Sequence, residues 1–331
     1  MNIRETVGID ISKLTIDVRI HSNQMFEQFE NSNKGFVKLL KWVNKYSSFS
    51  NNETIFIFEH TGLYSYLLSV FLTEKNIPFV IIPGLEIKKS MGIVRGKEDK
   101  IDATKIALYG YRLKEELKPC KLPSKAIIQV KRLLSIRERL VKHRAGYKAS
   151  LKEQKRILSR KNNSILFEVQ EKMMITLSKQ IDKVEQRIQT IIKCDDELIN
   201  TYQLLTGIKG IGTQTALFLI AYTEGFSKFK NARKFASYCG IAPFPNSSGT
   251  SIRGRTKVSN LANKKIKSLL DLCAKSAIQN NPEMKIYYHK RIKEGKSKMS
   301  TINIIRNKLL ARAFAVVQRK TPYVDVFKYA A

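Results

Sequence analysis

The first eighty residues alternate between strand-like and helix-like segments, and this order constrains the fold more than any other feature of the sequence. TVGIDIS and LTIDVRI are alternating, β-branched runs that predict two strands, and ETIFIFEH predicts another. GLYSYLLSVFLTEKN has the apolar spacing of a helix, and IPFVIIP predicts a buried strand that ends at Pro83. This order of strand, helix and strand predicts an α/β domain with a mixed or parallel sheet.

Acidic residues recur at particular places in this α/β segment. Asp10 lies within the first predicted strand, Glu59 ends the strand FIFE, and Asp99 and Asp102 lie three residues apart on one side of a predicted helix. Carboxylates at strand centres and ends are costly to bury unless a positive group compensates them. Any one of them alone is typical of a cap or a surface ion pair, but the four together favour a pair of divalent cations that assist phosphoryl transfer.

The chain is strongly basic, and its charge is unevenly distributed. It holds 60 Lys and Arg against 28 Asp and Glu, which gives a net charge of +32. Residues 1–60 hold 7 basic and 7 acidic residues, residues 121–161 hold 14 and 2, and residues 251–331 hold 19 and 4. Such basic stretches favour binding to a polyanion, with nucleic acid as the first candidate and a merely solvated or ribosome-associated surface as the alternative.

Several classes of protein are disfavoured by the sequence. The four cysteines, Cys120, Cys194, Cys239 and Cys273, have no paired spacing, so neither a zinc site nor a disulfide framework is indicated. The N-terminus lacks an apolar signal core, and no later run approaches the roughly 18 apolar residues of a membrane span. We expect a soluble cytoplasmic protein with no membrane partner.

The middle of the chain has the apolar spacing of long packed helices. Met173, Leu177, Ile181, Val184, Ile188 and Ile191 follow each other at steps of four and three residues, as along a helical seam. The preceding run VKRLLSIRERLVKHRAGYKASLKEQKR is strongly basic. An intramolecular helical hairpin and an intermolecular coiled coil explain this seam equally well.

The C-terminal part contains two motifs that suit contact with phosphate. In LLTGIKGIGTQTALFLIAYTEG, glycines lie between two apolar helical stretches, which resembles a helix-hairpin-helix element whose backbone amides face a phosphate, with Lys209 in the turn. Such turns also occur in ordinary helical domains. The stretch GIAPFPNSSGTSIRGRTKVSN is expected to be a loop, in which Arg253, Arg255 and Lys257 follow the adjacent serines Ser247 and Ser248. A serine in such a basic loop could act as a nucleophile on a phosphate, although most loop serines are structural.

Taken in order, these motifs resemble a known family. VGIDISK, FEHTG, RGKEDKIDATKIA, GIKGIG and GIAPFPNSSGTSIRG are similar to the DEDD-type serine transposases and DNA invertases of the insertion-sequence-110 family, from about Val7 to the helix around Asp271. Many members follow the last motif with a lysine and a glycine where this chain has Asn260 and Ala262. The resemblance implies a RuvC-like (ribonuclease-H-like) fold for residues 1–120, a helical coiled-coil region over 121–200, and a mostly α-helical transposase domain over 201–331.

The resemblance also implies a chemistry and a set of partners. It implies that Asp10, Glu59, Asp99 and Asp102 bind Mg²⁺ or Mn²⁺, and that Ser248 is the nucleophile that becomes linked to the 5′ phosphate of DNA, with Ser247 as the adjacent alternative. Members of the family act as homo-oligomers, and we expect a dimer that becomes a tetramer in synapsis. They are guided by a structured noncoding RNA, and we expect the protein at the bacterial nucleoid.

Other functions remain open at this point. A metal-dependent nuclease or junction resolvase would need the four acids and not Ser248. An architectural nucleic-acid-binding protein would need neither, and an invertase of the same family would use the same residues on inverted sites.

Overall fold

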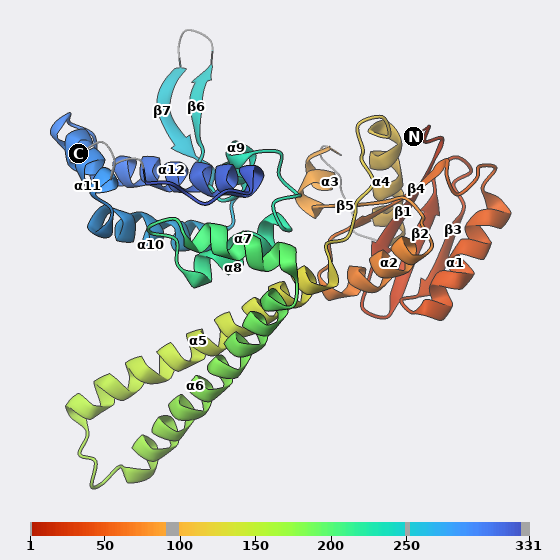
Figure 1. Ribbon diagram of the computed structural model, residues 1–331. Coiled ribbons are helices and arrows are strands. Elements are labelled where there is room, and N and C mark those ends of the chain that lie inside the picture. Colours follow the sequence, from red (N-terminus) through yellow and green to blue (C-terminus); the bar gives the residue numbers. More distant parts are fainter. Residues whose placement is uncertain (1, 91–98, 249–251, 326–331) are drawn as a thin grey trace. The chain divides into compact units, whose positions relative to one another are not determined.

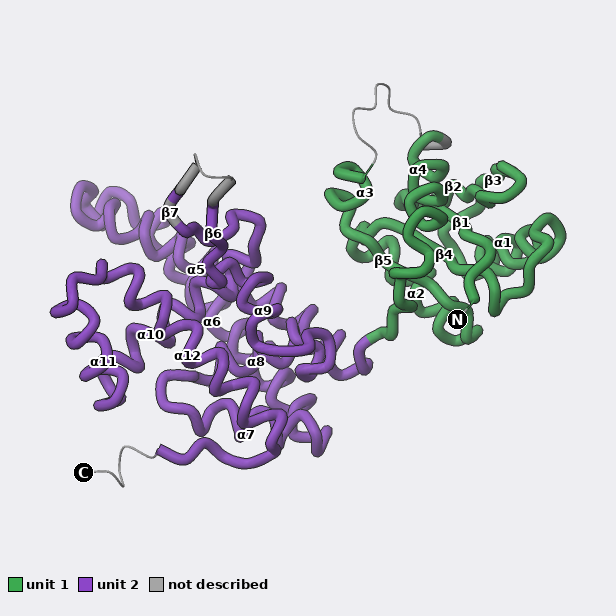
Figure 2. The backbone as a smooth tube through the Cα atoms, turned by 90° about the horizontal axis from the view of Figure 1, so that it is seen from above, with its two compact units in different colours: residues 1–122 green, residues 123–331 purple. Residues whose placement is uncertain are grey.

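The computed structural model describes residues 2–90, 99–248 and 252–325. Within this part, the side chains of Asp99, Lys100, Ser247, Ser248, Ile252, Arg253 and Arg255 are not described. The chain divides into two compact units, residues 1–122 and 123–331 (Figure 2). The second unit contains both the predicted middle region and the predicted C-terminal domain, so the boundary between residues 200 and 201 stays a prediction.

The first unit is built on a five-stranded mixed sheet. Its strand order is β3-β2-β1-β4-β5, with β1 antiparallel to β2 and parallel to β4. The strands are β1 (Glu5–Ile11), β2 (Thr15–Ile20), β3 (Phe26–Glu30), β4 (Thr54–Glu59) and β5 (Phe79–Ile82), and the helices are α1 (Asn33–Tyr46), α2 (Leu63–Glu74), α3 (Gly84–Ser90) and α4 (Asp99–Arg112). The prediction of an α/β domain with a mixed sheet is confirmed, and the architecture is consistent with a RuvC-like domain.

The sheet is buried on both faces because helices cover each of them. On one face Val7, Ile9 and Phe58 join a core with residues of α1 and α2, such as Phe36 and Leu68. On the other face the core consists of apolar residues from β4, β5, α3 and α4, among them Ile57, Val80, Ile87, Ile106 and Tyr109. Since side chains alternate along a strand, the even-numbered residues of β1 face the second side.

Helix α4 lies directly against β1, and glycine makes this approach possible. A Cβ atom at Gly8 would lie 2.3 Å from the Ala107 nitrogen and 2.5 Å from the Ala103 oxygen. The Thr6 hydroxyl donates to the Ala107 carbonyl at 3.1 Å. At Gly110, farther along the helix, an added Cβ would meet Ile57 and Thr6. The helix therefore runs opposite to β1, and its first turn lies toward the end of β1 that carries Asp10.

The second unit begins with two long helices. Helices α5 (Lys125–Ile157) and α6 (Ser164–Lys193) lie side by side as a hairpin (Figure 1). Arg137 pairs with Glu185 at 2.6 Å, and Lys155 pairs with Glu171 at 2.9 Å. Of the predicted seam, Leu177, Ile181, Ile188 and Ile191 are buried, whereas Met173 is 38% exposed. The structure thus shows the intramolecular hairpin, one of the two alternatives left open by the sequence.

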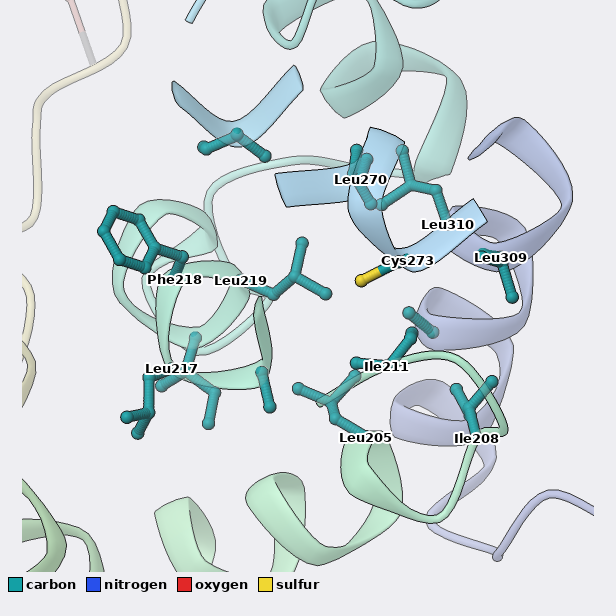
Figure 3. Close-up of a cluster of buried hydrophobic side chains, with 14 of the residues drawn as sticks. Leu205, Ile208, Ile211, Leu217, Phe218, Leu219, Leu270, Cys273, Leu309 and Leu310 are labelled. Carbon is teal, nitrogen blue, oxygen red and sulfur yellow. The ribbon is translucent and has the colours of Figure 1, made fainter. Parts of the chain in front are cut away.

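In the described part of the second unit, six shorter helices and a β-hairpin follow. They are α7 (Asp196–Thr206), α8 (Thr213–Thr223), α9 (Ala232–Tyr238), β6 (Pro243–Ser248), β7 (Ile252–Val258), α10 (Lys264–Asn280), α11 (Pro282–Lys293) and α12 (Lys298–Arg319). Figure 3 shows their shared core, in which Leu217 and Leu219 of α8, Leu270 and Cys273 of α10 and Leu309 of α12 lie together. No helix in the described part of the chain is long and apolar enough to span a membrane.

The stretch that contains the two serines is a β-hairpin, so the expectation of a loop was wrong. β6 and β7 form a two-stranded antiparallel sheet, and the register shifts between Phe244 and Asn246. Proline has no N–H to donate, and the irregularity at Pro245 accommodates this missing donor. A two-stranded ribbon with such a shift can hold the prolines, serines and glycines that suggested a loop.

Candidate active site

The ends of the two central parallel strands bring two of the predicted acids to neighbouring positions. Ile9 of β1 is paired with Phe58 of β4, and Asp10 and Glu59 follow directly after these residues in the chain. Because side chains alternate along a strand, both acids face away from the core that holds Ile9 and Phe58, toward the side covered by α3 and α4. Both residues are partly buried. The fold therefore places Asp10 and Glu59 on one side of the sheet at one edge.

The carboxylate of Glu59 has a defined place against the start of α3. A Cβ atom at Gly84 would lie 2.0 Å from Glu59 Oε1 and 2.7 Å from Oε2. Any larger residue at position 84 would occupy the space that the carboxylate now fills. The Tyr109 hydroxyl of α4 donates to Glu86 Oε1 of α3 at 2.8 Å and so links these two helices. Burial, and then this hydrogen bond, raise the pKa of Tyr109 to about 12, so the hydroxyl stays protonated as a donor.

The remaining two predicted acids belong to the first turn of α4. Asp102 Oδ1 accepts from Lys105 Nζ at 2.8 Å, with 33% of the Asp102 side chain and 21% of the Lys105 side chain exposed. Asp99 is the first residue of α4, and its side chain lies outside the described part of the structure. Residues three apart on a helix lie on the same side, so the backbone is compatible with the predicted pair.

The described side chains supply some of the donors of the predicted metal site. Among the described side chains, no three Asp, Glu, His or Cys residues come together in a way that could hold a metal ion. The donors that are present have suitable chemistry, because carboxylate oxygens are the ligands that Mg²⁺ and Mn²⁺ prefer. Because residue 84 is a glycine, no side chain at this position covers the Glu59 carboxylate. The ion pair between Asp102 and Lys105 is partly exposed. Replacing Lys105 by a metal ion as the partner of Asp102 therefore costs little free energy.

A further carboxylate lies beside Asp10 that the sequence did not single out. Asp17 of β2 is paired with Asp10 across the β1–β2 ladder, so the two residues share a face of the sheet. Asp17 is only 3% exposed and accepts from Gln28 Nε2 at 2.9 Å. A second carboxylate opposite Asp10 increases the need for a compensating positive charge. The signal in the sequence was its position between Ile16 and Val18 in a strand that is buried on both faces.

In the second unit, the turn between α7 and α8 has the features expected of a phosphate-binding turn. Gly210 has a φ of +99°, and a Cβ there would lie 2.8 Å from Ala277 Cβ, so the turn packs against α10. Gly212 caps the N-terminus of α8 without a side-chain hydrogen bond, and no atom lies within 4 Å of the position of its missing Cβ. Helix N-termini of this kind favour negative charge.

Lys209, the predicted phosphate contact in this turn, has a partner within the chain. Its Nζ lies 3.0 Å from Asp325 Oδ2, with 40% of the Lys209 side chain and 12% of the Asp325 side chain exposed. The sequence gave no indication of this contact, because the two residues are far apart in the chain. A nucleic-acid phosphate at this turn would have to compete with the Asp325 carboxylate.

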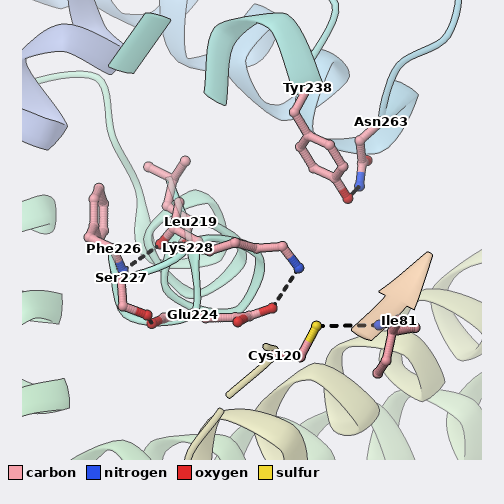
Figure 4. A network of polar contacts seen from close by, with 10 residues as sticks. Ile81, Cys120, Leu219, Glu224, Phe226, Ser227, Lys228, Tyr238 and Asn263 are labelled. Atoms are coloured by element: carbon pink, nitrogen blue, oxygen red, sulfur yellow. Dashed lines mark hydrogen bonds and ion pairs between the residues drawn. The ribbon is translucent and has the colours of Figure 1, made fainter. Parts of the chain in front are cut away.

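The β6–β7 hairpin is firmly attached at its base. The side-chain amides of Asn303 and Asn307 on α12 both donate to the Ile241 carbonyl, at 2.9 and 3.0 Å. Asn263 caps the N-terminus of α10 and donates from Nδ2 to the Tyr238 hydroxyl of α9 at 3.1 Å (Figure 4). These contacts hold the segments that enter and leave the hairpin.

Register defines the positions of the serines and basic residues on the hairpin. Ser247 is paired with Arg253, and Ser248 is paired with Ile252. Arg253, Arg255 and Lys257 occupy alternate positions of β7, and Lys257 is exposed. The side chains of both serines and both arginines lie outside the described part, so their predicted roles stay predictions.

An ion pair links α10 to α12. The Arg306 guanidinium is 7% exposed and pairs with Asp271, which also accepts from Lys275 at 2.9 Å. Burial raises the pKa of the Asp271 carboxyl, but the hydrogen bonds from Arg306 and Lys275 outweigh this effect and hold the pKa below its usual value. Because Arg306 lies near Asn303, whose oxygen accepts from it at 3.3 Å, the pair supports the helix that anchors Ile241.

Comparisons with known proteins give two family matches and several relatives. Residues 7–157 match a family described as a transposase, the DEDD type of IS110, and residues 202–289 match the family described as transposase IS116/IS110/IS902. The chain is 28% identical to the pilin gene-inverting proteins of Moraxella lacunata and Moraxella bovis over 327 residues, which are 96% of this chain and 97% of each relative. It is 29% identical over 120 residues, 36% of this chain and 29% of the relative, to an uncharacterized 43.6 kDa protein of insertion element IS110 from Streptomyces coelicolor.

Proposed function

We infer the chemistry of this chain from its membership of the IS110 family of transposases, which both family matches indicate. The protein is a transposase-type DNA recombinase and acts on DNA. We propose that Asp10, Glu59, Asp99 and Asp102 together hold the divalent metal that a DEDD-type family implies, with Mg²⁺ or Mn²⁺ as the ion. A divalent ion bound there would neutralise charge on the phosphate that is cut.

One observation carries this proposal more than any other. Asp10 and Glu59 occupy adjacent positions at the ends of the two central parallel strands. Helix α4 packs against β1 at Gly8, and its first turn, which contains Asp99 and Asp102, lies toward the same end. Three elements that are separate in the sequence thus bring carboxylates toward one edge of the sheet, and the buried Asp17 adds negative charge beside Asp10.

We propose that the nucleophile is the hydroxyl of Ser248, at the end of β6. Its oxygen would form a bond to the 5′ phosphate, the 3′ oxygen of the cut strand would leave and take up a proton, and the serine would lose its own. The basic residues at alternate positions of β7 and the anchored base of the hairpin support this role. Ser247, which is paired with Arg253 in the register, is the alternative nucleophile.

We also propose that the recombinase works as a homo-oligomer with a noncoding guide RNA. In this proposal the carboxylates of the first unit and the serine of the second both take part in the reaction, in an assembled dimer or tetramer at the bacterial nucleoid. The net charge of +32 and the two basic stretches support binding of a large amount of nucleic acid. If RNA is bound, the protein purified at low salt should contain RNA of defined length that ribonuclease removes.

Site-specific inversion is the second candidate within the same chemistry. The two relatives that align over 96% of the chain are both pilin gene-inverting proteins. A plasmid that carries paired sites in inverted orientation distinguishes the outcomes, because an invertase reverses the intervening segment while a transposase excises or inserts it.

Replacing single acids tests the proposed chemistry. Asp102→Asn and Glu59→Gln should abolish strand cleavage in Mg²⁺ while leaving DNA affinity nearly unchanged, since one charge among many hardly alters the field. Glu153→Gln is a matched control for Asp102→Asn, because Glu153 also forms an (i, i+3) ion pair on a helix, with Arg156 at 3.1 Å. The control should cleave like the wild type. Wild-type cleavage by Asp102→Asn would remove this residue from the site.

A further inference from the structure

We propose that Arg19 and Lys105 bind a backbone phosphate of the DNA strand that the carboxylates act on, at a small cavity beside Asp102. This inference rests on the proposed cleavage of DNA and adds a binding site in the first unit, apart from the basic residues of the C-terminal half. It defines a part of the path of the DNA strand over α4.

The cavity lies between β2 and α4. It has a volume of about 270 Å³ and is lined by Arg19, Ile101, Thr104, Lys105 and Leu108. Pockets for whole small molecules usually measure roughly 300–1,000 Å³, so this one suits a single group rather than a nucleotide. Among the described residues that line it, two are cations and none is acidic.

Arg19 has donor capacity that the described part of the chain does not use. It is paired with Gly8 of β1, the residue against which α4 packs, so it lies on the same side of the sheet as α4. Its Nη2 donates to Gln24 Oε1 at 2.9 Å. Its Nε is buried, and no described atom accepts from it. A buried N–H of a charged group without an acceptor is costly, and a phosphate oxygen would satisfy it.

Lys105 connects this cavity to the candidate active site. Its Nζ pairs with Asp102 at 2.8 Å, and an ammonium has further N–H groups to donate. A phosphate in the cavity could therefore be bound by Lys105 while the same lysine still contacts Asp102. The arrangement would place one phosphate of the strand within a helical turn of a carboxylate that acts on a neighbouring phosphate.

The salt dependence of DNA binding tests this site quantitatively. Each phosphate contact contributes about 0.9 to the slope of log affinity against log salt for duplex DNA, and about 0.7 for a single strand. For the full-length chain with a labelled duplex, Arg19→Ala should lower the slope by close to the value of one phosphate contact. It should also weaken binding about tenfold at moderate salt, which is the lower end of the range for losing a hydrogen bond to a charged group. Arg19→Lys should retain part of the affinity.

Arg4 provides the matched control in the same unit. It precedes β1, is 57% exposed and pairs with Glu53 at 3.5 Å. Arg4→Ala removes the same charge and should leave the slope unchanged. Circular dichroism melts of each variant will show that the fold is retained.

Two results would overturn the proposal. An unchanged slope for Arg19→Ala would show that Arg19 makes no phosphate contact. A slope that falls for RNA and not for DNA would assign the cavity to an RNA strand instead. Neither result affects the proposed cleavage chemistry, which the Asp102→Asn variant tests separately.

Discussion

Replacing Gly84 by alanine should inactivate the protein while hardly changing its stability. The added Cβ would lie 2.0 Å from Glu59 Oε1 and 2.3 Å from Cδ, where ordinary contacts begin near 3.4 Å. The carboxylate would therefore have to retreat by more than 1 Å. Because it is the end of a flexible side chain, it can rotate away at a cost of about 0.5–1.5 kcal/mol. Removing a glycine stabilises by about 0.4–1 kcal/mol through the unfolded state, so the two effects nearly cancel.

The effect on catalysis should be much larger. A displacement of about 1 Å in a group that positions the reacting atoms can reduce the rate roughly 100-fold. We expect Gly84→Ala to cleave a labelled DNA target in Mg²⁺ at least that much more slowly, while its Tm stays within about 4 °C of the wild type. Both quantities can be measured on the same preparation, by gel electrophoresis of the cleavage products and by thermal melting.

Gly146 serves as the control, because an added Cβ there meets no atom within 4 Å and lies within helix α5. Gly146→Ala should melt at or slightly above the wild-type temperature and cleave normally. If Gly84→Ala cleaves as fast as the wild type with an unchanged Tm, the place of the Glu59 carboxylate does not matter for the reaction, and the reasoning about this site is refuted.

Two further predictions concern the second unit. Asp325→Asn should raise DNA affinity by up to about fivefold, because it frees Lys209 from an ion pair worth about 1 kcal/mol at most. The gain in affinity should vanish in a Lys209→Ala background. It should also be absent in the control Glu224→Gln, because the ion pair of Glu224 with Lys228 at 2.7 Å has similar exposure. Asp271→Asn should lower the free energy of unfolding by about 3 kcal/mol near neutral pH, since it leaves the buried Arg306 unpaired. The pKa of Asp271 is lowered in the folded state, so its contribution to the free energy of unfolding is present above its usual pKa of 3.8 and is lost as the pH falls below that value. The difference in free energy of unfolding between wild type and variant, measured by chemical denaturation, should therefore shrink in acid. A difference that stays constant would contradict this assignment.

The sequence predicted the centre of the first unit well because its strands have clear patterns. The alternating β-branched residues of TVGIDIS and the run ETIFIFEH correspond to β1 and β4, the two strands that carry Asp10 and Glu59 near their ends. It gave no sign of β3, because the edge strand FEQFE has no buried residue and therefore no apolar alternation. The composition of the β6–β7 region suggested a loop, because proline, glycine and serine are frequent in both loops and irregular two-stranded ribbons.

The parts of the site that depend on tertiary contacts could not be predicted. Asp17 lies between two apolar residues of a predicted strand, but only the register shows that it is opposite Asp10 and only the fold shows that it is buried. The pairing of Lys209 with Asp325 and the anchoring of Ile241 by Asn303 and Asn307 join residues that are far apart in the sequence. No local pattern records such contacts, since they arise from the packing of helices that each have their own apolar spacing.

The central claim, a serine that attacks DNA with the help of the carboxylates, is tested most directly by looking for a covalent protein–DNA product. With a labelled target and any guide RNA supplied, the wild type should give a denaturation-resistant adduct on the 5′ phosphate of the break. Ser248→Ala should lose the adduct and recombination together, while it still folds and binds DNA. If Ser247→Ala loses both activities and Ser248→Ala keeps them, the nucleophile is the neighbouring residue. If both variants still cut and recombine DNA and no adduct forms, a water-using metal nuclease explains the activity and the serine mechanism is contradicted.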